Sequence, residues 1–365
     1  MNFEFSEDQL QFRQEIRRFM VNEAPLSKTR AILESSEHLD RTVWQSMQAM
    51  GIQNIMSPEQ CGGFGLGAYE LCISAEEIGR QLAPIPSLGC LYLAQQLLLQ
   101  CEPSNIRDDA LSKIGEGSIG CLVVNIDDHA STDIQLADNM LTGTNELVHN
   151  ANEADLFICH AKDSQGNQYI TLSYRDTSMN TRALSLLDNS CSAGTVTLTQ
   201  TPALILASGD DCNKILERCL NHAAILLSFE QLGAADSALE MATRYASERS
   251  AFGRIIGSYQ GIKHKLVDAY TLNQLARVHC YYAAWAMASS PDDVSKAAAT
   301  AIISSSKAMS FIAKENIQTH GGMGYTWEMD CHLFLKRSRH YAVALGPETH
   351  WQQQLSSCLL AHSTC

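Results

Sequence analysis

The chain has 365 residues, and its 40 acidic and 26 basic side chains give a formal net charge of −14. Hydrophobic residues make up 45% and charged residues 18% of the sequence, proportions that exclude a disordered chain and fit a globular protein of two or three domains. The negative net charge argues against nucleic acid or an anionic membrane as the main partner. No apolar run reaches the ~20 residues that span a bilayer, and the acidic opening segment predicts no secretory signal.

Thirteen cysteines are the unusual feature of this composition. They occur singly, without any CxxC pair, and most lie inside apolar segments. A disulfide framework is typical of small secreted domains with an even number of cysteines, and a metal site needs clustered ligands. We therefore expect buried, reduced thiols, no metal and a cytoplasmic location.

The first third of the sequence carries the signals of successive helices. Ser6 and Gln9 form a capping box before an amphipathic stretch, which predicts a helix from Glu7 into residues 17–20. Glycine and proline residues end the later apolar stretches. The further predicted helices cover residues 42–50, 68–82, 87–100 and 103–114.

The middle third changes to short segments rich in β-branched and aromatic residues. Turn-forming residues such as those at 162–166 separate these segments, a pattern typical of a small antiparallel β-domain. The expected strands cover residues 120–126, 140–148, 155–161, 168–174 and 194–201.

The last third returns to long amphipathic helices. One of them starts at Ser290, with Pro291 in its first turn, and is expected to reach His320, where glycines 321 and 322 stop it. Long antiparallel helices of this kind predict a four-helix bundle. The fold class is therefore mainly α with a middle β-domain. The predicted domains are residues 1–118, 119–208 and 209–365.

Three segments carry candidate chemistry: SPEQCGGFGLG at 57–67, YASERSAFGRIIGSYQ at 245–260 and IQTHGGMGYTWE at 317–328. In the second, Arg249 is followed three residues later by Phe252, which suits a pyrophosphate beside a ring. Taken singly, each segment is also compatible with an ordinary capped helix end or turn. The first does not follow a strand, which argues against a dinucleotide fingerprint there.

Together and in this order, the three segments resemble the acyl-CoA dehydrogenase family over essentially the whole chain. The resemblance implies a helical domain, a small antiparallel β-barrel or sandwich and a four-helix bundle that hold FAD in dimers or tetramers. It implies that Arg249 meets the FAD pyrophosphate with Phe252 packed nearby, and that Tyr259 and Gln260 line the site.

The third segment is implied to act across a subunit boundary. In the family, Gln318, Gly321 and Gly322 would come from the adjoining subunit and hold the adenosine-diphosphate half of FAD. The basic run at 336–339 and Arg254 would add positive charge for the phosphates. The segment GYTWEMDCHLFLKR resembles the corresponding segment in one branch of the family. The resemblance to this branch implies a hetero-oligomer that acts on CoA thioesters of steroid side chains. An acyl-CoA substrate and electron transfer flavoprotein as the acceptor are carried over in the same way.

The catalytic base of the family is not found. The reaction removes the α-proton of the thioester with a carboxylate and sends the β-hydrogen to the flavin as hydride. Counting from Gly321, the position of the usual glutamate holds Leu345, and the alternative position at 221–224 holds no acid either. Glu348 and Glu230 are the nearest substitutes, so the catalytic residue stays unassigned.

The family's contacts to the flavin ring are also altered, because residues 124–131 and 147–149 lack the expected patterns. Three hypotheses remain open. The chain is a subunit of a heterotetramer whose homologous partner supplies the base, with two copies of each subunit. It is a self-sufficient homotetrameric enzyme that uses Glu348 or Glu230. Or it is a flavin-free subunit that contributes stability or CoA binding.

Overall fold

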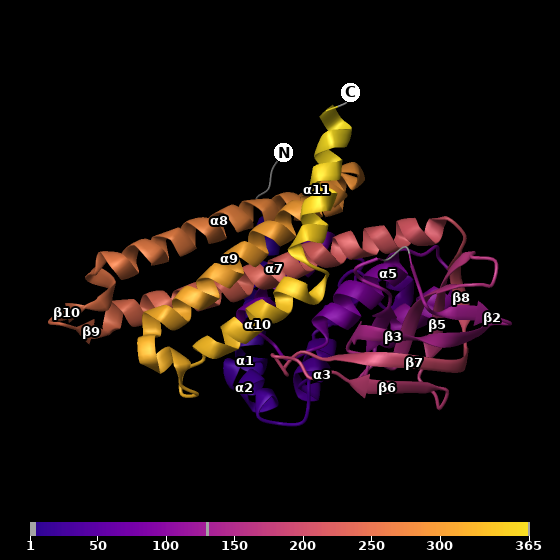
Figure 1. Cartoon of the computed structure of the whole chain (residues 1–365), viewed down its shortest axis with the longest axis horizontal. Helices are drawn as coiled ribbons and strands as arrows, with labels where there is room; N and C mark the ends of the chain where they lie inside the picture. The colour runs from indigo at the N-terminus through magenta and orange to yellow at the C-terminus, as the bar shows by residue number, and fades with distance from the viewer. Residues whose placement is uncertain (1–4, 129–130, 364–365) are drawn as a thin grey trace. The chain divides into compact units, whose positions relative to one another are not determined.

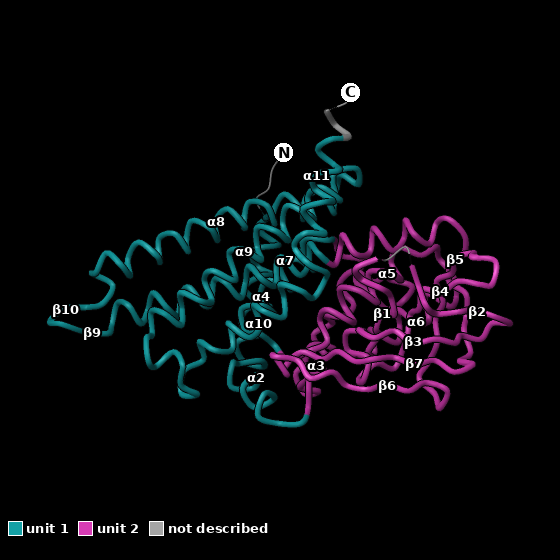
Figure 2. The backbone as a smooth tube through the Cα atoms, in the orientation of Figure 1, with its two compact units in different colours: residues 1–36, 68–83, 224–365 teal, residues 37–67, 84–223 magenta. Residues whose placement is uncertain are grey.

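The computed structural model describes residues 5–128 and 131–363, and it confirms the expected fold class, mainly helical with a β-region in the middle of the sequence (Figure 1). The chain groups into two compact units (Figure 2). Unit 1 comprises residues 1–36, 68–83 and 224–365, and unit 2 comprises residues 37–67 and 84–223. The three-domain division with boundaries after residues 118 and 208 stays a prediction.

The N-terminal helices follow their capping signals. Ser6 and Gln9 form the predicted box: the Ser6 side chain accepts from the Gln9 N–H at 3.2 Å, and the Gln9 side chain accepts from the Ser6 N–H at 3.0 Å. One helix was not predicted, because Pro25 begins it without a side-chain cap. The helices are α1 (Glu7–Glu23), α2 (Leu26–Leu33), α3 (Arg41–Ala49), α4 (Ala68–Arg80), α5 (Gln95–Gln100) and α6 (Asn105–Gly115).

The expected single helix over residues 87–100 is wrong in its first half. Ser87–Ala94 forms a π-helix and only Gln95–Gln100 is α-helical. Every residue of Ser87–Ala94 is buried, so the segment shows no amphipathic period from which its geometry could be read. Gly89 sits where a Cβ would come within 2.7 Å of the His149 carbonyl oxygen, which places this turn against the β-region.

The β-region of unit 2 is an eight-stranded sheet of order β6-β7-β3-β2-β4-β5-β8, with β1 also paired to β4. Most pairs are antiparallel, but β1 and β2 both run parallel to β4, so the expected all-antiparallel arrangement is wrong there. The outermost described strands of the order, β6 and β8, do not pair with each other, so the sheet is not a closed barrel. The strands are β1 (Gly120–Val123), β2 (Gln135–Ala137), β3 (Met140–His149), β4 (Leu156–Lys162), β5 (Gln168–Tyr174), β6 (Met179–Ala183), β7 (Ala193–Pro202) and β8 (Leu204–Ser208).

The parallel pairings have a simple cause. A parallel neighbour requires a crossover, and the hairpin of β2 and β3 supplies it between β1 and β4. That hairpin turns at Asp138 and Asn139, which both have positive φ, as a two-residue type I′ turn requires. The unpredicted strands β2, β6 and β8 have only three to five residues, too few to show an alternating pattern.

The C-terminal helices are long, as predicted. Ser290 and Pro291 open a short 3-10 turn that leads into the third long helix, which ends at His320 as expected. A two-stranded hairpin, β9 (Ser250–Ala251) and β10 (Arg254–Ile255), joins the first two. The helices are α7 (Asp211–Glu248), α8 (Gln260–Ser289), α9 (Val294–His320), α10 (Cys331–Ala344) and α11 (Glu348–Ser363).

Within unit 1, helices α4 and α7 cross at backbone contact. A Cβ at Gly79 would lie 1.9 Å from the Glu230 carbonyl oxygen, and a Cβ at Gly233 would lie 1.8 Å from the Glu76 carbonyl oxygen. Neither distance is tolerable for a side chain, so both glycines are needed for this approach.

We therefore predict that Gly79→Ala or Gly233→Ala lowers the free energy of unfolding by at least ~1–3 kcal/mol, because overpacking forces the helices apart. Urea unfolding followed by circular dichroism measures the change. Gly261→Ala is the matched control, since its new Cβ would meet no atom within 4 Å. Equal stability of all three variants would contradict this account of the crossing.

Candidate functional site

The hairpin that follows α7 presents an aromatic side chain to solvent. Phe252 and Gly253 form its turn with φ values of +52° and +80°, the left-handed region that non-glycine residues rarely adopt. The Phe252 side chain is 98% exposed, the highest value among the large hydrophobic residues that the structure describes. An exposed aromatic ring on a constrained turn indicates a surface that another molecule covers.

Tyr259 and Arg254 hold the hairpin in shape. The Tyr259 hydroxyl donates to the Ala251 carbonyl at 2.9 Å, and the Arg254 guanidinium lies 3.9 Å from the centroid of the Tyr259 ring. The structure therefore gives Tyr259 a supporting position beneath the turn. Gln260 is exposed as the first residue of α8.

Arg249 is a solvent-exposed cation next to this hairpin. Its backbone N–H donates to the Tyr245 carbonyl at 2.9 Å, which continues the end of α7. No ion pair of its guanidinium is found within the part of the chain that the structure describes. The side chain is thus available for an anionic ligand.

The glycine-rich end of α9 lies at the same end of unit 1. The rings of Tyr245 on α7 and His320 on α9 stack with centroids 4.2 Å apart, which brings the two segments together. Gln318 is exposed, and a Cβ at Gly321 or Gly322 would meet no atom within 4 Å. An exposed backbone without side chains allows a ligand to approach closely.

His320 itself is bonded to its own helix. Its Nδ1 lies 2.8 Å from the Asn316 carbonyl oxygen, and the residue is only 4% exposed. Burial lowers the pKa of the imidazole, which favours the neutral ring. This geometry assigns His320 to the end of its own helix.

The position where a catalytic glutamate is expected is apolar. Leu345 is 2% exposed, and its carbonyl accepts from the Trp351 indole N–H at 2.9 Å. Glu230 is buried, accepts from the Tyr341 hydroxyl at 2.9 Å and lies 3.7 Å from the Arg337 guanidinium. Its Oε1 makes both contacts, whereas its Oε2 is buried without a hydrogen-bond partner among the described residues, so Glu230 is held in place by one oxygen.

The second substitute is equally engaged, on the surface. Glu348 forms an ion pair with Lys307 at 3.3 Å and accepts from Gln352 at 2.5 Å. The basic run at 336–339 does not form one phosphate-binding cluster either. Arg337 is 2% exposed and donates to the Leu82 carbonyl at 3.1 Å, so its expected contact with nucleotide phosphates is wrong.

The alternative base region at the start of α7 holds a histidine. His222 lies 3.3 Å from Gln96 and 3.5 Å from Gln100, both in unit 2. Burial lowers the pKa of His222 to about 4, with a smaller contribution from Arg218. The imidazole is therefore neutral at neutral pH.

The altered flavin-ring segments lie in the β-region. Residues 129 and 130 of the first segment fall outside the described residues. In the second segment, Leu147 is exposed and His149 is 4% exposed. Neither side chain restores the contacts to the flavin ring that the family pattern expects in this segment.

The described cysteines are all free and mostly buried, as expected. Burial raises the pKa of the thiol of Cys90 to about 12, so it stays protonated and unreactive. Within residues 5–128 and 131–363, no group of three or more His, Cys, Asp or Glu side chains could hold a metal ion. No helix in the same ranges combines the length and apolar character that crossing a membrane requires.

Comparison with known proteins gives consistent matches over the whole chain. The models for the acyl-CoA dehydrogenase N-terminal and C-terminal domains match residues 6–116 and 213–353. The acyl-CoA dehydrogenase IpdE2 of Mycobacterium tuberculosis is 30% identical over 355 residues, covering 96% of this chain and 97% of that protein. The IpdE2 of Mycolicibacterium smegmatis is 29% identical, covering 96% and 99%.

Solved structures show the same fold. A variant of the Tcur3481-Tcur3483 steroid ACAD aligns with a TM-score of 0.87 and 24% identity, covering 98% of this chain and 99% of that one. The ChsE4-ChsE5 complex of Mycobacterium tuberculosis aligns with a TM-score of 0.87 and 23% identity, covering 99% of both chains.

The low pKa of His222 predicts acid sensitivity. The folded value of about 4 lies below the ordinary value of 6.5, so the unfolded chain binds more protons between the two. The contribution of the neutral His222 side chain to the free energy of unfolding is present above about pH 6.5 and is lost as the pH falls toward about 4. His222→Gln should therefore make the fall in unfolding free energy shallower, which urea titrations across this range measure. The same replacement at exposed His264 is the control, and equal slopes for the two variants would contradict the assignment.

Proposed function

Since the chain belongs to the acyl-CoA dehydrogenase family, we propose that it is one subunit of a flavin-dependent enzyme whose homologous partner supplies the catalytic base. The family is that of oxidoreductases acting on CH–CH groups, and the proposed reaction is α,β-desaturation of an acyl-CoA thioester. The observation that carries the proposal is the buried Leu345 at the position of the base. Of the two substitutes, Glu230 is held through one oxygen by the Tyr341 hydroxyl, and Glu348 is paired with Lys307 on the surface.

Because Arg249 and the segment 318–322 lie at the same end of one bundle, we propose that one chain presents both to the adenosine-diphosphate half of FAD, instead of two adjoining subunits as the resemblance implied. Arg249 offers an exposed guanidinium, which binds phosphate through two parallel hydrogen bonds. Phe252 offers an exposed ring, and the backbone at Gly321 and Gly322 is open to close approach, with Gln318 beside it. FAD, when bound, accepts the β-hydrogen as hydride.

The chain's own residues would prepare the site without moving the α-proton. Arg249 and Gln318 would bind and orient the cofactor, and Phe252 would cover it from water. Leu345 cannot accept a proton, so in this proposal the α-proton leaves to a carboxylate of the partner subunit. A thioester α-proton is weakly acidic, and its removal needs a base held in a dry pocket.

The partner and substrate are proposed by likeness. Two structures with this fold are described as a paired steroid acyl-CoA dehydrogenase and as a two-protein complex. We infer a heterotetramer with two copies of each homologous subunit, acting on a bulky CoA thioester such as one of a steroid side chain. Electron transfer flavoprotein would reoxidise the cofactor, and the reduced thiols fit a cytoplasmic location.

Co-expression is the direct test. The chain purified alone should hold little FAD and show little desaturation of acyl-CoA, because its site lacks a base and part of the flavin contacts. The chain purified with a homologous acyl-CoA dehydrogenase subunit should gain both, measured as the flavin-to-protein absorbance ratio and as turnover with a dye acceptor. Full activity of the single chain would contradict the proposal and favour the homotetramer, whereas a colourless but stable complex would favour a flavin-free subunit.

A second prediction concerns Arg249. Replacing this cation in the assembled enzyme by Arg249→Gln should weaken FAD binding at least tenfold, because hydrogen bonds to charged groups contribute about 1.5–3 kcal/mol. Fluorescence of released flavin during dilution measures the affinity. Arg41→Gln, at an exposed arginine in α3 of unit 2, removes the same charge outside the segments assigned to FAD and should leave the flavin content unchanged. Similar losses in both variants would argue against a specific phosphate contact.

A further inference from the structure

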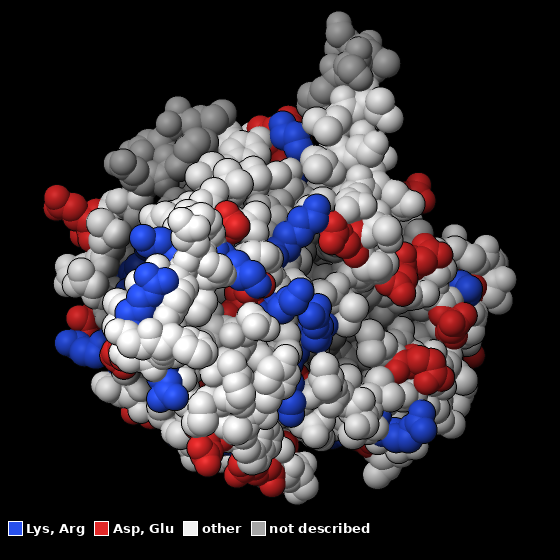
Figure 3. Space-filling model, turned by 60° about the vertical axis from the view of Figure 1, so that its left-hand side comes forward, with Lys and Arg blue, Asp and Glu red and all other residues white. Residues whose placement is uncertain are grey.

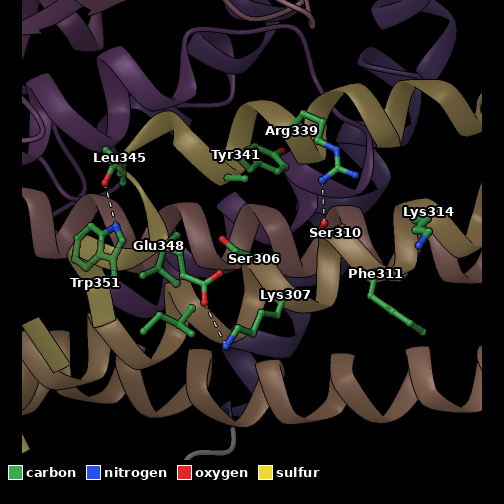
Figure 4. A pocket seen from close by; sticks show the side chains of 14 residues that line it. Ser306, Lys307, Ser310, Phe311, Lys314, Arg339, Tyr341, Leu345, Glu348 and Trp351 are labelled. Carbon is green, nitrogen blue, oxygen red and sulfur yellow. Dashed lines mark hydrogen bonds and ion pairs between the residues drawn. The ribbon is translucent and has the colours of Figure 1, made fainter. Parts of the chain in front are cut away.

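A groove of about 730 Å³ lies in unit 1, lined by residues 236–247 of α7, by Gly257 and by residues 263–274 of α8. None of the residues assigned above to FAD lines this α7–α8 groove. It also differs from the groove that Figure 4 shows between α9, α10 and the start of α11. That groove contains Leu345 and Glu348, so it belongs to the positions already considered for the catalytic base.

Beside the α7–α8 groove, α8 exposes a stripe of four large apolar side chains. Val267, Tyr270, Leu275 and Val278 are 55%, 57%, 53% and 64% exposed. Their spacing of three, five and three residues places all four on one side of the helix. Val267 and Tyr270 also line the groove, so the stripe and the groove form one continuous surface. An exposed apolar surface of this kind marks a contact with another molecule.

The stripe is arranged symmetrically along α8, with its centre between residues 272 and 273. An antiparallel α8 of a second copy, related by a two-fold axis at this centre, would place Val267 opposite Val278 of the second copy and Val278 opposite its Val267. Tyr270 and Leu275 would face each other in the same way. This reciprocal order is what a two-fold contact between identical chains requires.

The polar residues on the same side of α8 also match under this axis. Thr271 would lie opposite Gln274 of the second copy, and a hydroxyl and an amide can hydrogen-bond to each other. The exposed Asp268 would lie opposite Arg277, whose side chain is 21% exposed. Residues 266–277 contain no other charged side chain, so no like charges meet at the centre of this contact.

The charge of the groove permits contact between two acidic chains. A formal net charge of −14 makes two copies repel each other where acids are in excess. On the face that Figure 3 shows, Lys and Arg side chains gather around the middle, so the negative charge is not evenly distributed. Both acids that line the groove are bound to arginines of their own chain. The charged lining residues are two acids and two bases: Asp236, Glu240, Arg244 and Lys263.

We propose that α8 binds α8 of a second copy of this chain through the apolar stripe. Antiparallel packing places the second half of one helix over the first half of the other, so Leu275 and Val278 of each copy would enter the α7–α8 groove of the other. The contact would join two copies of this chain within one assembly. It uses none of the residues assigned to FAD and does not depend on which subunit supplies the base.

Sedimentation velocity tests the contact on the chain co-purified with a homologous acyl-CoA dehydrogenase subunit. The unmodified assembly should contain two copies of this chain. Val278→Glu should separate it into halves and raise the dissociation constant between them at least about tenfold, because the new carboxylate would be buried against Val267 of the second copy. Val21→Glu, at a 50% exposed valine of α1, is the matched control and should leave the mass unchanged.

Three outcomes would overturn the proposal: a single copy of this chain in the unmodified assembly, equal masses of the Val278→Glu and Val21→Glu variants, or release of the homologous subunit by Val278→Glu. The last result would assign α8 to the homologous subunit. A chain that purifies without that subunit, yet forms a two-copy assembly that Val278→Glu separates, would contradict the proposed function and support this contact.

A second substitution tests the register of the two helices. Adding Val267→Lys to Val278→Glu places an ammonium group of each copy opposite the carboxylate of the other, so association should recover at least in part. The two positions are eleven residues apart, too far for a pair within one helix, so the recovery would report a contact between copies. No recovery in a double variant with an unchanged circular dichroism spectrum would overturn the proposed pairing.

Discussion

The close crossing of α4 and α7 is the constraint on which unit 1 depends. Gly79 and Gly233 let the two backbones touch, and this contact buries acidic side chains that need charged partners. Glu76, 1% exposed, receives hydrogen bonds from Arg13 at 2.7 Å and from Arg277 at 3.0 Å. Removing one partner of a buried carboxylate is strongly destabilising. Since Arg13 lies on α1 and Arg277 on α8, the burial of Glu76 at the crossing also determines where these two helices pack.

The ionic network extends along α7 toward the hairpin. Asp236 accepts from Arg277 at 2.6 Å and from Arg80 at 3.3 Å, while Arg80 also reaches Glu240 at 2.6 Å. Burial raises the pKa of Asp236, and Arg277 opposes that rise by stabilising the carboxylate. These contacts hold the later part of α7 to α4 and α8, which gives the exposed Phe252 beyond them a rigid support.

The sequence predicts what is local and misses what is set by distant packing. The Ser6 cap, the helix end at His320 and the turn residues could be predicted because each signal lies within a few residues. The π-helix of Ser87–Ala94 and the parallel pairing of β1 with β4 could not, since burial on all sides and a crossover leave no periodic pattern. The burial of Arg337 has the same cause: a basic run suggests exposed charges, and only the packing of distant segments buries this one.

The candidate site shows the same division, and it explains why the functional proposal involves a second chain. The motif around Arg249 and Phe252 predicts a ligand contact, and both side chains are exposed; a 98% exposed ring on a turn with positive φ has no stabilising role in this chain by itself. Leu345 could be recognised only by its departure from the family, since a missing carboxylate leaves no pattern of its own. An exposed candidate surface for a cofactor, combined with a buried leucine at the position of the base, is the arrangement expected of the proposed subunit, whose site a homologous partner would complete.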